Sequence, residues 1–313
     1  MKFFVTGVGG QLGRDVMNEL AARGYEGVGS DIQETFSGIQ DGSPVTTMPY
    51  VQLDITDEAA VRNTLNEIKP DVVVHCAAWT AVDAAEDEAN RPKVNAINAL
   101  GTRYIAEAAK AHGCKMIYIS TDYVFPGDGE TPWDPDCHDY APLNVYGSSK
   151  LDGEMAVSGL LEKYFIVRIA WVFGLNGKNF IKTMLNVGKT HDHVRVVNDQ
   201  IGTPTYTLDL ARLLVDMAET EKYGYYHATN EGGFISWCDF TKEIYRQAAE
   251  MGLENYGKIF VEPVTTEEYG LSAAARPFNS RLDKSKLVKN GFTPLPTWQD
   301  ALGRFLKDYL AQE

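Results

Sequence analysis

Short, uninterrupted hydrophobic runs recur along the first half of the chain, with segments of helical periodicity between them. The runs occupy residues 3–5, 27–29, 71–78, 115–120 and 164–168. Residues 58–68 and 96–112 place apolar side chains on one helical face, and Gly113 is suited to end the second of these helices. Because buried strands that alternate with helices form parallel sheets covered on both faces, we predict a doubly wound α/β domain.

The pattern changes after about residue 175, where the apolar runs become shorter and prolines more frequent. Three further helices are predicted from amphipathic segments at residues 207–220, 237–251 and 298–310. We therefore predict a large domain over residues 1–174 and a smaller C-terminal α/β lobe over residues 175–313, with strands or helices exchanged between them. Residues 34–50 lack periodicity and are rich in Gly, Ser, Thr and Pro, which predicts a mobile surface loop.

Composition and charge narrow the classes of function. The 313 residues are 44% hydrophobic and 23% charged, which is enough apolar material for a sizeable core. The formal net charge of −14 argues against nucleic acid or an anionic membrane as the main partner. The four cysteines are widely spaced, and no apolar stretch has the length of a signal sequence or a membrane span, so we predict a soluble, cytoplasmic protein.

Three glycines follow the first predicted strand at G-x-x-G-x-x-G spacing. Gly7, Gly10 and Gly13 lie between that strand and a helical pattern that continues through Leu20. Glycine lets such a turn approach a diphosphate, whose charge then lies at the positive end of the helix dipole. Any strand-to-helix turn can use glycine, but this spacing in this context predicts a dinucleotide site in a Rossmann-type fold.

Acidic and small residues at later strand ends extend the predicted dinucleotide site. Asp31 ends the second strand, where a carboxylate can accept hydrogen bonds from the adenosine ribose, and no arginine follows closely to hold a 2′-phosphate. This favours NAD, although the sequence is compatible with both NADH and NADPH. Asp54 and Ile55 are placed to contact the adenine, and Ala77 and Ala78 leave space for the cofactor. An ordinary turn aspartate and ordinary strand-end packing are the alternative interpretations.

Tyr146 and Lys150 are four residues apart and therefore share one face of a helix that residues 151–157 continue. Reduction of a carbonyl needs a proton for the developing alkoxide, and a phenol supplies it best when a neighbouring cation stabilises the phenolate. Lys150 is such a cation and can also contact the nicotinamide ribose. The spacing alone is equally typical of an exposed pair on a helix.

A polar cluster follows the strand at residues 115–120, at the sheet edge where α/β proteins bind ligands. Thr121 can polarise a substrate carbonyl there beside Tyr146, and Asp122 can contact sugar hydroxyls or orient the site. A strand-end turn or a helix cap is the alternative for both residues. Together with the glycine turn, the cluster favours a reductase site over a surface pair.

These motifs together resemble the extended short-chain dehydrogenase/reductases, and within them the dTDP-4-dehydrorhamnose reductases. The matching motifs are Thr6-Gly7-x-x-Gly10-Gln11-Leu12-Gly13, Ser120-Thr121-Asp122-Tyr123-Val124-Phe125, Tyr146-x-x-x-Lys150 and Trp171-Val172-Phe173. Residues 77–86, 198–205 and 276–280 also match, so the resemblance covers nearly the whole chain. It implies reduction of the C4 keto group of dTDP-4-dehydro-6-deoxy-L-mannose to dTDP-L-rhamnose by NADH or NADPH, for cell-surface polysaccharides.

The resemblance also implies roles for individual residues. The implied catalytic triad is Thr121, Tyr146 and Lys150. The implied cofactor contacts are Gly7, Gly10, Gln11, Leu12, Asp31, Asp54, Ile55, Ala77, Ala78, Thr80, Tyr146 and Lys150. The substrate candidates are Thr121, Asp122, Trp171, Arg276 and Asn279. Without the resemblance, Trp171 is interpreted as a core aromatic residue and Arg276 as the partner of an acidic surface.

Tyr123 stands where related dehydratases carry an acidic residue, which favours reduction over dehydration. Some members of the family bind Mg²⁺ at a dimer interface, but the sequence shows no carboxylate cluster, and Asp15 alone is equally a first-turn residue favourable to the helix dipole. A metal and a homodimer therefore stay open. His75 lies in an apolar strand and is predicted to be a core histidine. The alternative functions are a non-catalytic, dinucleotide-binding regulatory subunit and a reductase or epimerase of another nucleotide sugar.

Overall fold

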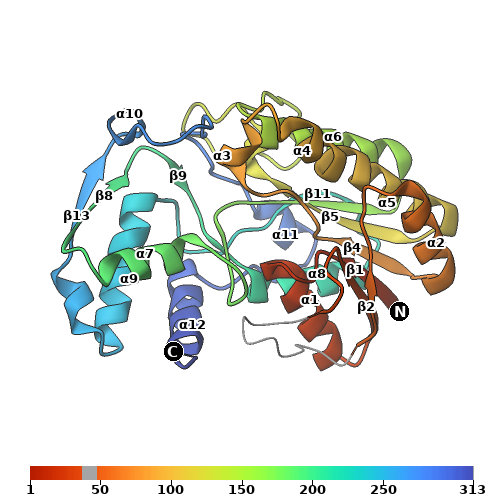
Figure 1. Ribbon diagram of the computed structural model, residues 1–313, viewed down its shortest axis with the longest axis horizontal. Helices are drawn as coiled ribbons and strands as arrows, with labels where there is room; N and C mark the ends of the chain where they lie inside the picture. The colour runs from red at the N-terminus through yellow and green to blue at the C-terminus, as the bar shows by residue number, and fades with distance from the viewer. Residues whose placement is uncertain (37–47, 313) are drawn as a thin grey trace.

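A parallel sheet of seven strands lies at the centre of the computed structural model, which describes residues 1–36 and 48–312 (Figure 1). In chain order the strands are β1 (Lys2–Thr6), β2 (Glu26–Asp31), β3 (Tyr50–Gln52), β4 (Val72–His75), β5 (Lys115–Thr121), β6 (Tyr164–Ile169) and β11 (Gly224–His227). They lie across the sheet in the order β11, β6, β5, β4, β1, β2 and β3. The predicted doubly wound, Rossmann-type fold is confirmed.

The observed strands differ from the predicted ones at two places. β4 ends at His75, so Cys76 and the alanines after it form a loop at the carboxyl edge of the sheet. Tyr50, which was predicted to lie in a surface loop, begins β3 and pairs with Gly29. Most of that predicted loop falls on residues 37–47, outside the described residues. His75 is buried between two threonine hydroxyls, which confirms it as a core histidine.

Helices cover both faces of the sheet (Figure 1). They are α1 (Gln11–Ala22) and α8 (Thr207–Ala218) on one face, and α2 (Glu58–Ile68), α5 (Thr102–His112) and α6 (Val145–Leu160) on the other. In β1, Phe3 and Val5 pack beneath α1 and α8, whereas Phe4 packs beneath α2 and α5. Successive strand side chains point to opposite faces, so an uninterrupted apolar strand supplies both cores.

Two predicted helices have different boundaries in the structure. α1 begins at Gln11, so Asp15 lies beyond its first turn and the first-turn interpretation of this residue is wrong. The Asp15 carboxylate is buried, accepts a hydrogen bond from Thr207 at 2.5 Å, and has its pKa raised to about 6 by burial. The predicted helix at residues 96–112 consists of the π-helical segment η1 (Ala96–Gly101) followed by α5. Gly113 ends α5 in the left-handed conformation, as predicted.

Segments beyond residue 174 complete this sheet and its cover. β11 pairs in parallel with β6 at one edge of the sheet, and α8 packs against α1. The C-terminal part of the chain therefore contributes β11, α8 and the buried side chains of Leu287, Phe292 and Leu295 to the large α/β unit. The division at residues 174 and 175 stays a prediction.

A second core lies beside the carboxyl edge of the sheet, on the left in Figure 1. It is built by α7 (Phe180–Gly188), β8 (His193–Val197), α9 (Trp237–Glu250), β13 (Phe260–Val264) and α12 (Trp298–Leu310). Phe173, Ile244 and Phe305 are among its buried side chains.

The shorter elements of the whole molecule are α3 (Val82–Ala85), α4 (Arg91–Asn95), η2 (Asp122–Val124), β7 (Val172–Phe173), β9 (Ile201–Gly202), β10 (Thr205–Tyr206), β12 (Ile235–Ser236), η3 (Glu254–Lys258), α10 (Thr266–Tyr269) and α11 (Ser285–Lys289).

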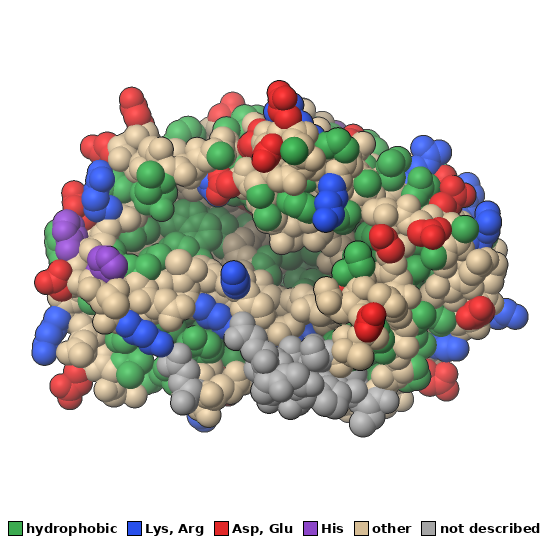
Figure 2. Space-filling view, viewed as in Figure 1, with side chains coloured by type: hydrophobic (Ala, Val, Ile, Leu, Met, Phe, Trp, Pro, Cys, Tyr) green, Lys and Arg blue, Asp and Glu red, His purple; other side chains and the backbone are tan. Residues whose placement is uncertain are grey.

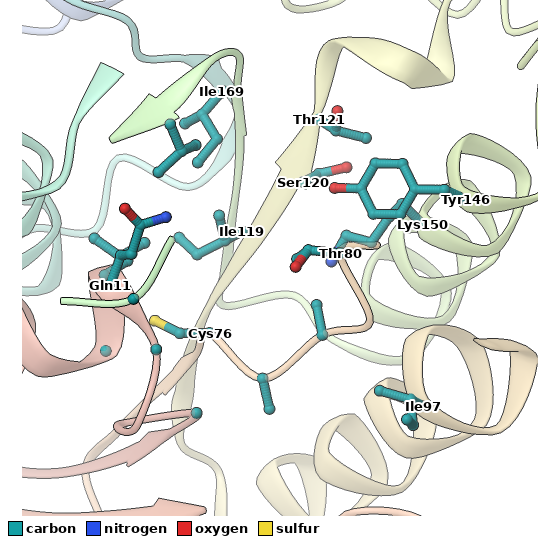
Figure 3. A pocket seen from close by; sticks show the side chains of 18 of the residues that line it. Gln11, Cys76, Thr80, Ile97, Ile119, Ser120, Thr121, Tyr146, Lys150 and Ile169 are labelled. Carbon is teal, nitrogen blue, oxygen red and sulfur yellow. The ribbon is translucent and has the colours of Figure 1, made fainter. Parts of the chain in front are cut away.

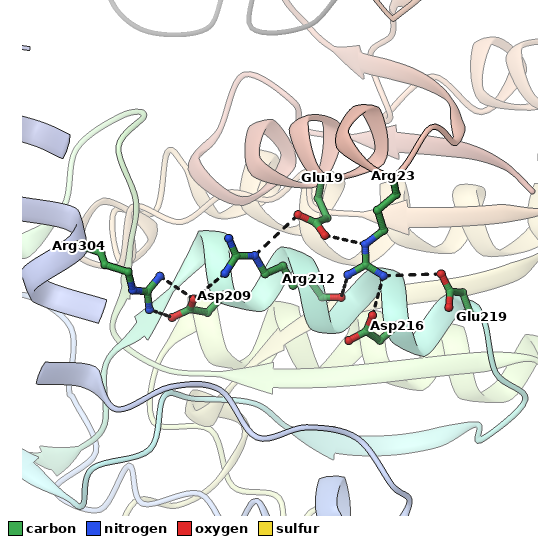
Figure 4. A network of polar contacts seen from close by, with 7 residues as sticks. All are labelled: Glu19, Arg23, Asp209, Arg212, Asp216, Glu219 and Arg304. Carbon is green, nitrogen blue, oxygen red and sulfur yellow. Dashed lines mark hydrogen bonds and ion pairs between the residues drawn. The ribbon is translucent and has the colours of Figure 1, made fainter. Parts of the chain in front are cut away.

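A polar network fixes α8 between α1 and α12 (Figure 4). Arg23, which follows the last residue of α1, donates hydrogen bonds to Glu19 on α1 and to Asp216 on α8, both at 2.6 Å. On the other side, Arg304 of α12 donates two hydrogen bonds, of 2.9 and 2.7 Å, to the Asp209 carboxylate. Because Asp209 is buried, its two-pronged pair stabilises the junction more than the exposed pairs do.

Candidate functional site

An open cavity of about 750 Å³ lies at the carboxyl ends of the central strands, between the sheet and the second core. Figure 2 shows the hollow on this face, with hydrophobic side chains along its floor. All predicted cofactor residues line the cavity: Gly7, Gly10, Gln11, Leu12, Asp31, Asp54, Ile55, Ala77, Ala78, Thr80, Tyr146 and Lys150. Of the substrate candidates, Thr121, Asp122 and Trp171 line it, whereas Arg276 and Asn279 do not.

The glycine turn leaves the first turn of α1 open to a ligand. Gly7 has φ +72°, and a Cβ there would lie 2.5 Å from the Ala77 nitrogen. A Cβ at Gly13 would lie 2.3 Å from the Gly7 carbonyl oxygen, so both positions require glycine. Gly10 precedes α1 without a capping side chain, which leaves the first N–H groups of the helix for an anion. The turn therefore fits the diphosphate of a dinucleotide.

Asp31 lies at the end of β2 on the wall of the cavity that faces the glycine turn. Its carboxylate accepts hydrogen bonds from the Gly9 nitrogen at 2.9 Å and the Ile32 nitrogen at 2.7 Å. Asp54 also lines this wall, and its carboxylate accepts two hydrogen bonds from Thr56. This end of the cavity therefore presents two carboxylates, both of which suit ribose hydroxyls.

Asn98 connects the loop after β4 to the helix that carries the tyrosine and lysine. Its side chain accepts a hydrogen bond from the Trp79 nitrogen at 2.8 Å and donates one to the Ser149 hydroxyl at 2.9 Å. Ser149 in turn donates to the backbone oxygen of Tyr146 at 2.8 Å. Asn98 lies in the π-helical segment η1, a distortion that is frequent at functional sites.

Lys150 is almost fully buried beneath the cavity, with its side-chain nitrogen 4.1 Å from the centre of the Tyr118 ring. Burial lowers the pKa of Lys150 to about 7, and the charge of Glu154 only partly opposes this effect. The lysine can therefore gain or lose a proton near neutral pH. Its position one turn after Tyr146 places both side chains at the same part of the cavity (Figure 3).

Tyr146 points its phenol toward the end of β5, beside Thr121 (Figure 3). Burial and the nearby Asp122 charge raise the pKa of Tyr146 above its ordinary value, while a hydrogen bond with the Thr121 side chain lowers it. The ring of Tyr123 meets the Tyr146 ring edge-on, with 5.7 Å between the centroids. Tyr146 is therefore a protonated, oriented phenol across the neutral range, as a general acid requires.

Trp171 has a strained backbone at the border between the sheet and the second core. Its φ is +51°, which is rare for a bulky residue, and its indole stacks on that of Trp237 at 3.8 Å between centroids. A Cβ at Gly202 would lie 3.0 Å from the Trp171 ring, so the missing side chain makes room for the indole. Both tryptophans line the cavity, where their stacked indoles form an aromatic wall.

The two substrate candidates outside the cavity lining have structural partners. Arg276 donates hydrogen bonds to both carboxylate oxygens of Asp83 on α3, at 3.1 and 2.6 Å. The Asn279 side chain is buried and donates to the backbone oxygens of Asp128 and Thr131. In this structure Arg276 ties the chain near residue 276 to α3, and Asn279 fixes the loop that follows it.

Sequence reasoning missed four residues that shape the site. Asn98 and Trp237 lie far from the catalytic motifs in the sequence, and no periodicity or spacing connects them to those motifs. Tyr118 lies in the strand that ends at Thr121, and Ser280 ends the matched segment 276–280, but the sequence assigned no role to either side chain. The residue type of Trp237 is a weak signal, because an aromatic residue at a helix start is more often part of a core. Their roles depend on contacts that only the folded chain creates.

Neither a metal centre nor a membrane span is found within residues 1–36 and 48–312. Across this part of the chain, no group of three or more His, Cys, Asp or Glu side chains is arranged to hold a metal ion. No helix there is long and apolar enough to cross a bilayer. The binding of Mg²⁺ to this protein therefore stays open, as it was from the sequence.

Comparisons with known proteins agree with this geometry. A family model described as "RmlD substrate binding domain" matches residues 1–311. A dTDP-4-dehydrorhamnose reductase of Aggregatibacter actinomycetemcomitans is 39% identical over 312 residues, covering 96% of this chain and 97% of the relative. A probable dTDP-4,6-dihydroxy-2-methyloxan-3-one 4-ketoreductase of Streptomyces antibioticus is 36% identical, covering 100% and 97%. A dTDP-4-dehydrorhamnose reductase of Bacillus anthracis, solved with NADP, has TM-score 0.85, 40% identity, and coverage of 98% and 99%.

Proposed function

This chain belongs to the RmlD substrate binding domain family, that of the dTDP-4-dehydrorhamnose reductases, and we propose that it reduces the C4 keto group of a dTDP-linked 6-deoxy-4-keto sugar. The carrying observation is the convergence of Thr121, Tyr146 and Lys150 on one cavity that also contains an uncapped glycine turn. The product from dTDP-4-dehydro-6-deoxy-L-mannose is dTDP-L-rhamnose. A regulatory subunit without catalysis would not need a buried lysine beside a buried phenol.

Each catalytic side chain has a task that its surroundings favour. The bound dinucleotide supplies the hydride to C4. Tyr146 donates its phenol proton to the oxygen on C4, and burial ensures that this proton is present at neutral pH. Lys150, in its charged form, stabilises the phenolate that remains, and that negative charge in turn favours protonation of the lysine. Thr121 donates a hydrogen bond to the same substrate oxygen.

The aromatic wall and the polar end of β5 provide the remaining contacts to the substrate. Trp171 offers an apolar surface to the deoxysugar ring, and Trp237 stacks on the Trp171 indole. Asp122 lines the same region, where it accepts a hydrogen bond from Thr121 and can meet sugar hydroxyls. The sugar then lies between Trp171 and Tyr146, with C4 directed toward the phenol.

The chain's own residues favour NADH over NADPH as the hydride donor. Asp31 and Asp54 line the adenosine end of the cavity, and no lysine or arginine occurs between Arg23 and Arg62 in the sequence. A 2′-phosphate would therefore meet negative charge without a compensating cation from this stretch of the chain. We expect a lower KM for NADH than for NADPH. The difference between the two KM values should be smaller in Asp31→Asn, because this variant lacks one of the negative charges. An equal or lower KM for NADPH would contradict this preference.

The reductase assignment is tested with purified protein, NADH and dTDP-4-dehydro-6-deoxy-L-mannose. We expect oxidation of NADH with formation of dTDP-L-rhamnose, and a loss of roughly 100-fold or more in kcat for Tyr146→Phe. Tyr104→Phe, a matched change on α5 outside the cavity, should retain full activity. NADH oxidation that is equally fast in Tyr146→Phe would refute the proposed role of this residue.

A different dTDP-linked 4-keto sugar is the second candidate substrate. The Streptomyces antibioticus relative, a probable 4-ketoreductase of another dTDP-linked sugar, matches this chain along its whole length. The two candidates share the carbonyl chemistry and differ in the hydroxyl and methyl pattern that meets Trp171. Comparing kcat/KM for several dTDP-linked 4-keto sugars under one set of conditions identifies the preferred ring.

A further inference from the structure

The Asp122 carboxylate is held from two directions by parts of the chain that are far apart in sequence. Thr121 donates its hydroxyl to Asp122 Oδ1 at 2.9 Å, and Ser280 donates its hydroxyl to Oδ2 at 2.5 Å. The exposed fractions are 5% for Thr121, 2% for Asp122 and 3% for Ser280. Each oxygen of this buried carboxylate therefore has one side-chain donor, and backbone hydrogen bonds of Asp122 and Tyr123 add to these two.

Ser280 lies on a backbone segment that hydrogen bonds hold in place, with its hydroxyl beside Asp122. Its backbone nitrogen donates to the Ile201 oxygen at 2.8 Å. The preceding residue, Asn279, donates one hydrogen bond from its backbone nitrogen to the Gly127 oxygen and another from its side chain to the Thr131 oxygen. A Cβ at Gly202 would lie only 3.0 Å from the Ser280 Cβ, so the two segments are in close contact. The segment around Ser280 is therefore a fixed support for the carboxylate.

Thr121 has one hydroxyl proton, and two acceptors compete for it: the Asp122 carboxylate and the carbonyl oxygen of a bound substrate. In the structure that proton goes to Asp122, while the Thr121 oxygen accepts a hydrogen bond from the Tyr123 nitrogen at 3.2 Å. The Thr121 hydroxyl also forms a hydrogen bond with the Tyr146 phenol. To polarise a substrate carbonyl beside Tyr146, the hydroxyl must turn away from Asp122. A buried carboxylate that loses a donor without another one close by is strongly unfavourable, and this opposes the rotation.

We propose that Ser280 is a positioning residue for the reduction: it keeps Asp122 fixed and hydrogen-bonded, so that the Thr121 hydroxyl can turn to the substrate carbonyl beside Tyr146. This inference rests on the proposed function. Ser280 touches neither the carbonyl nor the cofactor in this arrangement, and it acts through Asp122. The segment that carries Ser280 follows Arg276 and Asn279, so their structural contacts also serve to place this hydroxyl.

The charge state of Asp122 offers a second readout. Burial raises the pKa of Asp122 to about 6, and the hydrogen bonds from Ser280 and Thr121 act in the lowering direction. The titratable groups coupled to it are the phenols of Tyr123 and Tyr146, whose pKa values its charge raises, and Arg276 lies next to Tyr123. Removing the Ser280 hydroxyl should therefore raise the pKa of Asp122, so that the carboxylate is lost at a higher pH.

The test compares Ser280→Ala, Ser280→Thr and Ser280→Cys with the wild-type protein. We expect Ser280→Ala to lower kcat roughly tenfold, with the KM for NADH unchanged. The acidic limb of its kcat profile should move up by about one pH unit. Ser280→Thr, which keeps the hydroxyl, should recover most of both changes. Ser158→Ala, which removes a serine hydroxyl from α6 outside the cavity, should match the wild type.

Folding and function are separated by two further measurements. If Ser280→Ala does not fold, Ser280→Cys keeps the side-chain volume with a weak donor and should show the same slower, shifted profile. Carbon NMR of labelled aspartate follows the Asp122 titration without any substrate, so a wild-type protein inactive on 4-keto sugars would refute only the proposed function. Folded Ser280→Ala with wild-type kcat, pH profile and Asp122 titration would overturn the role of Ser280.

Discussion

Replacing Lys150 by methionine should abolish the reduction and, at the same time, stabilise the folded protein. The lysine lies beneath the cavity with about 3% of its surface exposed, and its side-chain nitrogen faces the Tyr118 ring at 4.1 Å. Burial lowers its pKa from 10.5 to about 7. An ammonium that the fold holds away from water destabilises the native state, and the protein keeps it because the phenolate of Tyr146 needs a cation.

The size of the effect follows from the pKa. A change from 10.5 to about 7 corresponds to about 5 kcal/mol of difference between the two protonation states of Lys150. Methionine has a similar length and no charge, so it avoids this desolvation. It also loses the contact between the ammonium and Tyr118, which is worth about 1–2 kcal/mol. We therefore expect Lys150→Met to unfold with a free energy about 3–4 kcal/mol higher near pH 7.

The pH dependence has a definite sign. Below about pH 7 the native protein carries the buried ammonium, so the full destabilisation is present. Between about pH 7 and 10.5 the native state has released the proton while the unfolded state still holds it, so the wild-type protein gains stability as the pH rises. The advantage of Lys150→Met should therefore shrink by about 1.4 kcal/mol for each pH unit in this window.

Urea unfolding at about pH 6.5 and about pH 9 measures this difference, with kcat measured on the same preparations. Lys110→Met, a change on the exposed face of α5, should leave both stability and activity unchanged. An advantage of Lys150→Met that is absent, or that stays constant between the two pH values, would refute the reasoning about the buried charge. A variant with wild-type kcat would refute the catalytic role.

Three other substitutions test separate parts of the structure. Gly13→Ala should weaken dinucleotide binding and destabilise the fold by about 1–3 kcal/mol, because its Cβ would meet a backbone oxygen at 2.3 Å; titration with NADH and urea unfolding measure both. Arg168→Met should lower the unfolding free energy by about 3–5 kcal/mol by leaving the buried Glu154 unpaired, and adding Glu154→Leu should restore most of it. Trp237→Ala should raise the KM for the sugar roughly fivefold, but not that for NADH, because Trp171 loses its stacking partner.

The sequence by itself determined the parallel sheet and the residues that line the predicted dinucleotide site. Uninterrupted apolar strands require cover on both faces, and close backbone contacts require glycine at positions 7 and 13, so both signals are local and strong. Tyr146 and Lys150 could be paired because helical periodicity fixes which residues share a face. The residues that motifs placed at strand ends all line the cavity.

Only the tertiary structure decided what surrounds these motifs. Trp237 and Ser280 reach the site from segments more than sixty residues away from Trp171 and Asp122 in the sequence, as the numbering shows. Such contacts depend on how the second core packs against the sheet edge, which no local pattern encodes. The same holds for Arg276, whose pairing with Asp83 rather than a ligand follows from the position of α3. Residue type suggests which chemistry is available to a side chain, and packing selects the partner that uses it.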